Sequence, residues 1–322
     1  MLTNNKPIKT PVTFVCLSCC TCKRPKMLSR ALNSIKKLII PDNLRVEVVI
    51  TDNDENESAK PVVKELQTEL KIPVHYFVEK KRGISNARNK TLEEVIKLKA
   101  SHMLFFDDDE MLDENCLIEH INLYQTNSQA FISSGPTVTV FLEKFPSFIT
   151  KHMVFKQKTS KQTGYIRQDC ACGNVFFPVS LIEDFNLRFD NEYVFMGGED
   201  GDFFKKASKL GFTIIWNNEA VIYEMVSKSR GNLKWILKKC YYNGYAAGMS
   251  KFKYERSKLK RIIYILKQTF VLIINLILLL PSLFFGLTAF FNRLGTCIRA
   301  QGKILSAVFL KPINFYRNIY GE

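Results

Sequence analysis

The N-terminal third of the chain alternates between short apolar runs and longer segments of helical periodicity, and this alternation limits the possible folds most strongly. Residues 12–17 and 44–51 are apolar and β-branched, a pattern typical of buried strands. Between them, apolar residues from Met27 to Leu38 recur at helical spacing behind Pro25. The pattern predicts an α/β fold with a mixed, mainly parallel sheet flanked by helices.

The alternation continues, and polar groups gather where the predicted strands end. A helix is expected over residues 59–70, a strand over 74–78, and another helix that begins with Ser85 as its N-cap. The cysteine-rich stretch, Asp52 and an acidic run each follow a predicted strand. Because ligands bind at the carboxyl ends of parallel strands, we expect a binding site there.

Two acidic motifs are candidates for chemistry. In the run Asp107–Glu110, strand periodicity would place Asp107 and Asp109 on one face, where the pair could meet one Mg²⁺ or Mn²⁺. In "GGEDGD", Glu199 and Asp200 would open a helix, where a carboxylate could act as a general base. The alternative for both motifs is a solvated surface segment.

The charge of the chain is unevenly distributed. The net charge is +15, yet residues 1–224 carry 29 basic and 29 acidic residues, so residues 225–322 supply all of it. This basic part contains 23 uncharged residues, Thr269–Phe291, against about 20 needed to span a bilayer. A span, a re-entrant hairpin, an in-plane helix and a buried helix all remain open. Since the positive charge accompanies apolar residues, a membrane surface is expected and a nucleic-acid partner is not.

These observations predict two parts, a catalytic domain over residues 1–250 and a basic, hydrophobic, helical, membrane-associated region over residues 251–322. The nine cysteines are few for a disulfide scaffold, and no apolar leader is visible at the first residues. We therefore expect reduced thiols in a cytosolic compartment. The C-x-x-C spacing of Cys19 and Cys22 fits zinc or redox sites, but no pair of this spacing exists outside residues 16–22, so packing in a buried strand is favoured.

Six short motifs occur in an order that resembles one known family. They are "TCKRP", "TDND", "KRGISNARN", "FFDDDE", "CGNVFF" and "GGEDGDFF", and they fall between about residues 12 and 250. In this order they resemble a family 2 glycosyltransferase with the nucleotide-sugar-binding GT-A fold. The resemblance implies an inverting transfer of a hexosyl group from a nucleotide-diphosphate sugar, with a UDP-sugar expected and Mn²⁺ or Mg²⁺ as cofactor.

The resemblance also implies roles for individual residues. Asp200 would be the catalytic base, and Glu199 would bind acceptor or orient Asp200. Asp109 would bind the metal. The residues expected to contact the nucleotide-sugar are Thr21, Arg24, Asp52, Arg88, Asp107 and Asp108.

The chain departs from the family pattern in two places. Many relatives carry a metal-binding histidine after the E-D motif, whereas this chain has Glu224 there, as a tentative ligand. The Q-x-x-R-W motif of processive synthases is absent, so transfer of one or a few sugars is expected.

The acceptor would be a glycan or lipid-linked hydroxyl used in cell-surface polysaccharide or lipopolysaccharide synthesis, at the cytoplasmic face of the inner (plasma) membrane. One alternative is a nucleotide-sugar-binding protein without catalysis. The other is a nucleotidyltransferase, although the glycine-rich phosphate loop of that class is missing after the first strand.

Overall fold

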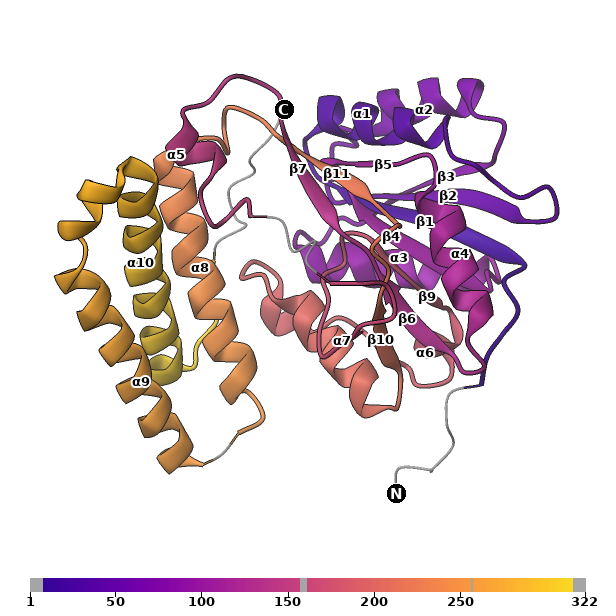
Figure 1. The fold of residues 1–322 in the computed structure, drawn as a ribbon. Helices are drawn as coiled ribbons and strands as arrows, with labels where there is room; N and C mark the ends of the chain where they lie inside the picture. Colours follow the sequence, from indigo (N-terminus) through magenta and orange to yellow (C-terminus); the bar gives the residue numbers. More distant parts are fainter. Residues whose placement is uncertain (1–7, 157–160, 256, 315–322) are drawn as a thin grey trace.

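The computed structural model describes residues 8–156, 161–255 and 257–314, and these form a sheet domain beside a layer of C-terminal helices (Figure 1). The elements of the first part are β1 (Phe14–Thr21), α1 (Pro25–Ile35), β2 (Arg45–Asp52), α2 (Lys60–Glu69), β3 (Val74–Val78), α3 (Ile84–Lys97), β4 (His102–Asp107), β5 (Glu110–Leu112) and α4 (Cys116–Thr126). The middle of the chain forms β6 (Phe131–Ser134), β7 (Thr137–Phe141), α5 (Ser147–Thr150), β8 (Ile166–Arg167), β9 (Val175–Pro178), α6 (Ser180–Glu183) and η1 (Asn191–Tyr193). The last elements are α7 (Glu199–Lys209), β10 (Thr213–Trp216), β11 (Ile222–Val226), α8 (Leu233–Phe252), α9 (Lys258–Ile277), η2 (Pro281–Phe285) and α10 (Leu287–Phe309).

The main sheet has eight strands in the order β3-β2-β1-β4-β9-β6-β10-β8. Strands β3, β2, β1 and β4 pair in parallel, and β9 runs antiparallel between β4 and β6. A second sheet has the order β5-β11-β7. Its strand β5 follows the acidic run at the end of β4, and its strand β11 precedes the C-terminal helix α8. The predicted mixed sheet flanked by helices is confirmed.

All eight residues of β1 are buried, which explains the cysteine-rich sequence of this central strand. Cys16, Cys19 and Cys20 lie inside β1, and burial raises the pKa of the Cys20 thiol to about 12. In the described part of the chain, every cysteine is free. Small apolar side chains fit a strand that is covered on both faces, so the packing interpretation of these cysteines is confirmed.

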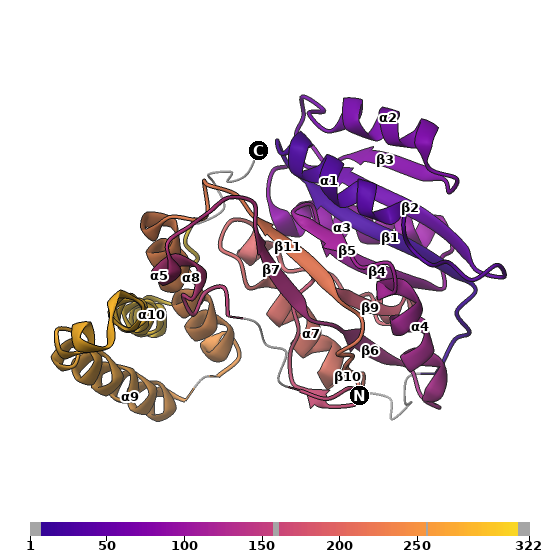
Figure 2. The same ribbon diagram turned by 45° about the horizontal axis from the view of Figure 1, so that its top comes forward.

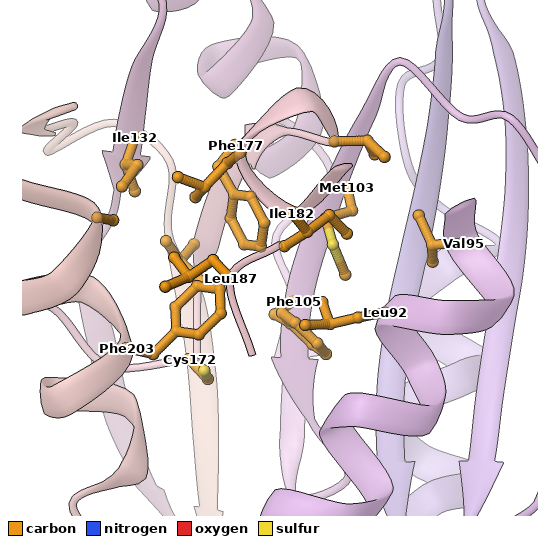
Figure 3. Packing of buried hydrophobic residues seen from close by; sticks show 14 of the residues in the cluster. Leu92, Val95, Met103, Phe105, Ile132, Cys172, Phe177, Ile182, Leu187 and Phe203 are labelled. Carbon is orange, nitrogen blue, oxygen red and sulfur yellow. The ribbon is translucent and has the colours of Figure 1, made fainter. Parts of the chain in front are cut away.

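Helices cover both faces of the main sheet (Figure 2). One core contains side chains from α1, α2 and α4, and the other contains side chains from α3, α6 and α7. In the second core, Leu92 and Val95 of α3 lie near Met103 and Phe105 of β4 (Figure 3). Because the sheet is packed on both faces, its loops at the strand ends stand on a rigid support.

The start of α3 differs from the prediction. The N-cap is Gly83, with φ of 128°, and Ser85 lies within the first turn. The Ser85 hydroxyl donates a hydrogen bond to the carbonyl of Asp190 at 2.9 Å. A β-carbon at Gly83 would overlap the side chain of Val194, so close contact with that loop requires glycine here.

The apolar run Thr269–Phe291 does not form one continuous helix. It is divided between the end of α9, the 3-10 turn η2 and the start of α10, with Pro281 and Gly286 at the breaks. In residues 8–156, 161–255 and 257–314, no helix combines the length and the apolar content that crossing a bilayer requires. The backbone of this run is therefore a helical hairpin, two helices joined by a short turn, and its association with a membrane stays a prediction.

Helix α10 packs against α8, and α9 lies on the outer side of α10 (Figure 1). Gly244 and Gly248 of α8 lie directly against the α10 segment Arg299–Ser306, where any β-carbon would overlap it. The predicted boundary at residue 250 therefore falls inside α8, a helix that belongs to the C-terminal layer. The two-part division itself stays a prediction.

Candidate active site

A cavity of about 540 Å³ opens at the carboxyl ends of β1, β2 and β4. Its wall also includes the start of α7, strand β11, and the beginning of α8. Of the residues expected from the sequence to act in the site, the cavity is lined by Thr21, Arg24, Arg88, Asp107, Asp109, Glu199, Asp200 and Glu224. The fold thus gathers eight of the ten at one place, although they span two hundred residues of sequence.

Asp108 is one of the two that do not line the cavity. It is fully buried, accepts a hydrogen bond from the Thr21 hydroxyl at 2.7 Å, and pairs with Arg24 at 2.6 Å. Burial raises the pKa of the Asp108 carboxyl, and the Arg24 guanidinium opposes this effect. Asp108 lies beneath the cavity and holds Thr21 and Arg24, and its expected contact with the nucleotide-sugar stays a prediction.

Asp52 is the other. Its carboxylate accepts hydrogen bonds from the Ala59 N–H at 2.8 Å, the Asp54 N–H at 3.1 Å and the Tyr76 hydroxyl at 2.8 Å. Its exposed fraction is 0%, and its oxygens bind the protein itself. The expected contact of Asp52 with the nucleotide-sugar stays a prediction. Asp52 fixes the loop after β2.

The next residue, Asn53, lines the cavity instead. Its amide donates to the carbonyls of Glu79 and Lys81 at 2.8 and 2.9 Å and accepts from the Gly83 N–H at 2.6 Å. Asn53 therefore ties the loop after β2 to the loop before α3. The "TDND" motif suggested this loop, but sequence alone did not distinguish which of its polar side chains faces the ligand space.

Arg88 connects the two acidic motifs. One of its nitrogens pairs with Glu199, and another lies 3.2 Å from Asp107. Burial raises the pKa of Glu199 to about 7, although the Arg88 guanidinium favours the charged form. Arg88 is itself 5% exposed, so it holds Glu199 at the start of α7.

Asp200 follows Glu199 in the first turn of α7 and lines the cavity. Its carboxylate accepts a hydrogen bond from the Gly201 N–H at 2.7 Å. A carboxylate at a helix N-terminus is stabilised in its charged form by the helix dipole. A carboxylate on the cavity wall at this place has the position that a general base needs.

The D-x-D pair is arranged by a turn and not by strand periodicity. Strand β4 ends at Asp107, and Asp108 and Asp109 form the turn before β5. The prediction that alternation along one strand puts Asp107 and Asp109 on the same face is therefore wrong, although both line the cavity. Because of this turn, Asp107 and Asp109 line the cavity while Asp108 between them is buried.

Asp109 is neutralised by two arginines. Arg24 lies 3.3 Å from its carboxylate, and Arg230, from the loop between β11 and α8, forms a second ion pair with it. Arg230 also lies 3.5 Å from Glu224. The guanidiniums of Arg24 and Arg230 thus surround the carboxylate that the family resemblance assigns to a metal.

The fit of a divalent cation follows from these pairs. Asp109 and Glu224 offer the oxygen ligands that Mg²⁺ and Mn²⁺ prefer. Within the described ranges, no group of three or more His, Cys, Asp or Glu side chains is arranged to hold a metal. Asp109 and Glu224, both within reach of Arg230, are the residues of this chain that would hold such a cation.

Some residues of the cavity were not anticipated from the sequence: Arg82, Glu110, Arg230, Trp235 and Lys239. Glu110 accepts a hydrogen bond from the Asp107 N–H at 2.7 Å and fixes the acidic turn. Arg230 and Lys239 belong to the strongly basic residues 225–322, although they lie inside the predicted catalytic domain, residues 1–250. A single arginine before glycine, just after the last strand, is the one sequence cue for Arg230.

The architecture is that of the GT-A fold, as two structural neighbours show. S. aureus TarS in complex with UDP-GlcNAc aligns with a TM-score of 0.54 and 13% identity, over 96% of this chain and 99% of that one. The mannosyltransferase PcManGT from Pyrobaculum calidifontis, in complex with GDP-Man and Mn²⁺, aligns with a TM-score of 0.55 and 15% identity, over 96% and 80%. Against a longer TarS structure, the chain covers 47% of that chain.

The model of the family described as "Glycosyl transferase family 2" matches residues 16–185, more than half of the chain, and the protein belongs to this family. A related sequence is the succinoglycan biosynthesis protein ExoM of Rhizobium meliloti (strain 1021). It is 28% identical over 229 residues, which cover 71% of this chain and 72% of ExoM. The family match ends before Glu199 and Asp200, so the structure of the cavity is what connects these residues with the family region.

Proposed function

We propose that the protein is an inverting, nonprocessive glycosyltransferase that moves a hexosyl group from a nucleotide-diphosphate sugar to an acceptor hydroxyl. The observation that carries this proposal is the cavity, where Asp200 at the start of α7 faces a space also lined by Arg24, Arg230 and Lys239. Anionic donor phosphates suit the cations, and an acceptor hydroxyl suits the carboxylate.

The chemistry follows from these positions. Asp200 accepts the proton of the acceptor hydroxyl as its oxygen attacks the anomeric carbon, and the nucleotide diphosphate leaves from the opposite side. Arg24 and Arg230 stabilise the charge that develops on the leaving group. A bound Mn²⁺ or Mg²⁺, held by Asp109 and Glu224, would supply further neutralisation of the diphosphate.

The donor and acceptor are proposed at the level of chemical class. A UDP-sugar is the first candidate, since a TarS structure contains UDP-GlcNAc, while the GDP-Man complex of PcManGT makes GDP-sugars the second. The relation to a succinoglycan biosynthesis protein supports a glycan or lipid-linked acceptor in cell-surface polysaccharide or lipopolysaccharide synthesis. We place the reaction at the cytoplasmic face of the inner (plasma) membrane.

A thermal-shift screen of UDP- and GDP-sugars, each with Mn²⁺ and with EDTA, tests the donor class. We expect one nucleotide-sugar to raise the melting temperature, and the shift to be larger with Mn²⁺. If no nucleotide-sugar stabilises the protein, the proposed function is wrong. An equal shift in EDTA would reject only the metal assignment.

A further inference from the structure

Helix α9 has an apolar face that no described part of the protein covers. Its side chains recur at intervals of four and three residues, and each is 50–68% exposed: Leu259, Ile263, Leu266, Phe270, Ile273 and Ile277. In α9 the one buried residue is Gln268, since the other side of the helix rests on α10. Monomeric proteins rarely leave so large a contiguous apolar surface in water.

The same surface continues around the turn after α9. Leu280 is 70% exposed, and Phe284 and Phe285 of η2 are 93% and 84% exposed. We call these exposed apolar side chains of α9, Leu280 and η2 the apolar face. It runs along the length of α9 and ends in two phenylalanines at the tip of the helical hairpin.

Positive charge accompanies the apolar face. Residues 251–322 contain twelve Lys and Arg and two Glu. On α9 itself, Lys258, Lys260 and Lys267 are exposed beside the apolar side chains. An amphipathic helix of this kind, with lysines next to large aliphatic and aromatic residues, fits the boundary of an anionic bilayer.

We propose that the apolar face docks in the plane of an anionic lipid bilayer, with the side chains of α9 and η2 in the acyl boundary and the lysines among the headgroups. The charge argues for lipid over a second copy of the chain. Two copies meeting through this face would bring the lysines of both together, whereas anionic lipid is complementary to them.

The proposed docking surface is tied to the catalytic helix. At the end of α8, Lys253 pairs with Asp190 at 2.7 Å, and the Tyr254 hydroxyl donates to Asp202 of α7 at 2.8 Å. Since Glu199 and Asp200 begin the same helix α7, the bilayer contact would orient the active site relative to the membrane. Orientation of the active site rests on the proposed function, whereas docking to lipid can be measured without any enzymatic activity.

Vesicle flotation of the purified full chain tests the proposal. The probes are vesicles of phosphatidylcholine alone and of phosphatidylcholine with phosphatidylglycerol. We expect binding to the anionic vesicles, weakened by salt. Ile277→Asp should lower the partition coefficient by roughly tenfold or more, because burial of one large aliphatic side chain is lost and a charge is added.

A matched control makes the same chemical change elsewhere. Ile39 is 48% exposed on the sheet domain, so Ile39→Asp should leave vesicle binding unchanged. Phe284→Asp provides a second test on a side chain that packs against little, and should also weaken binding. The proposal would be overturned if all variants bound equally or if the wild-type protein did not bind anionic vesicles. It would also be overturned if the wild-type protein sedimented as a dimer that Ile277→Asp dissociates.

Discussion

The buried pair Arg88–Glu199 allows a prediction whose sign and size come from the structure. In the wild-type protein, burial raises the pKa of Glu199 from an ordinary value of 4.5 to about 7 even with Arg88 beside it. Folding therefore favours the protonated form of Glu199. Protonation of Glu199 therefore contributes to the unfolding free energy in full below pH 4.5. This contribution, about 3 kcal/mol, is lost as the pH rises from 4.5 to about 7.

Arg88→Met removes the cation that lowers the pKa of Glu199, so this pKa rises above 7. The wild-type protein has then lost all of the protonation-dependent stability by about pH 7, whereas the variant goes on losing it. Above pH 7 the difference in unfolding free energy between wild type and variant should grow by up to about 1.4 kcal/mol per pH unit.

Urea unfolding of wild type and Arg88→Met at about pH 7 and about pH 8.5 measures this difference. The double variant Arg88→Met with Glu199→Gln should show no such growth, because it has no carboxyl to ionise. Groups that titrate elsewhere cancel between the proteins. A difference that is the same at both pH values, or that grows equally in the double variant, would refute the assigned pairing.

Three further predictions concern other parts of the structure. Arg230→Met should strengthen Mn²⁺ binding in the absence of nucleotide, measured by calorimetry, because the guanidinium no longer competes for Asp109; unchanged or weaker binding would contradict this. Asp52→Asn should lower the unfolding free energy by about 1–3 kcal/mol, because the carboxylate accepts three hydrogen bonds, and an unchanged unfolding free energy would contradict this; a loss of donor affinity as well would support the predicted ligand role. His102 and His120 are buried, which lowers their pKa values from 6.5 to about 3 and about 4, so stability should fall as the pH drops below 6.5. The two together predict a loss of about 4 kcal/mol by about pH 5, and replacing both with Gln should reduce that loss.

Much of the sheet domain could be predicted because its local patterns agree with its packing. Four of the eight buried residues of β1 lie in the strand predicted over residues 12–17, although β1 continues to Thr21. The apolar stripe of α1 follows from its helical periodicity. The strand Val74–Val78 has the bounds expected from sequence. Loops with polar clusters at strand ends also indicated where the site would form.

Side-chain direction within those polar clusters could not be predicted in the same way. In "TDND", Asp52 points into the protein and Asn53 lines the cavity; in "DDDE", Asp108 is buried between its neighbours. These outcomes depend on hydrogen bonds to partners far away in sequence, such as Tyr76 and Thr21. A two-residue period does not apply where the strand has already ended in a turn.

The C-terminal part contributed the largest surprise to the site. The excess positive charge of residues 225–322 predicted a membrane surface, yet Arg230 and Lys239 line the cavity, while Lys258 and Lys267 lie on the outer helix. The difference arises because α8 packs toward the sheet domain and α9 packs away from it. Composition cannot separate these two roles, since only the tertiary contacts decide them.

The most direct test of the central claim is transfer by Asp200→Asn. Wild type and variant are given the stabilising nucleotide-sugar and an acceptor extract, and release of the nucleotide diphosphate is followed. We predict that kcat falls by about 10²–10⁴-fold while donor affinity is kept, and that Asp184→Asn, on an exposed residue outside the cavity, behaves as wild type. An Asp200→Asn protein with wild-type kcat would contradict the assignment of Asp200 as the base and, with it, the proposed reaction at this site.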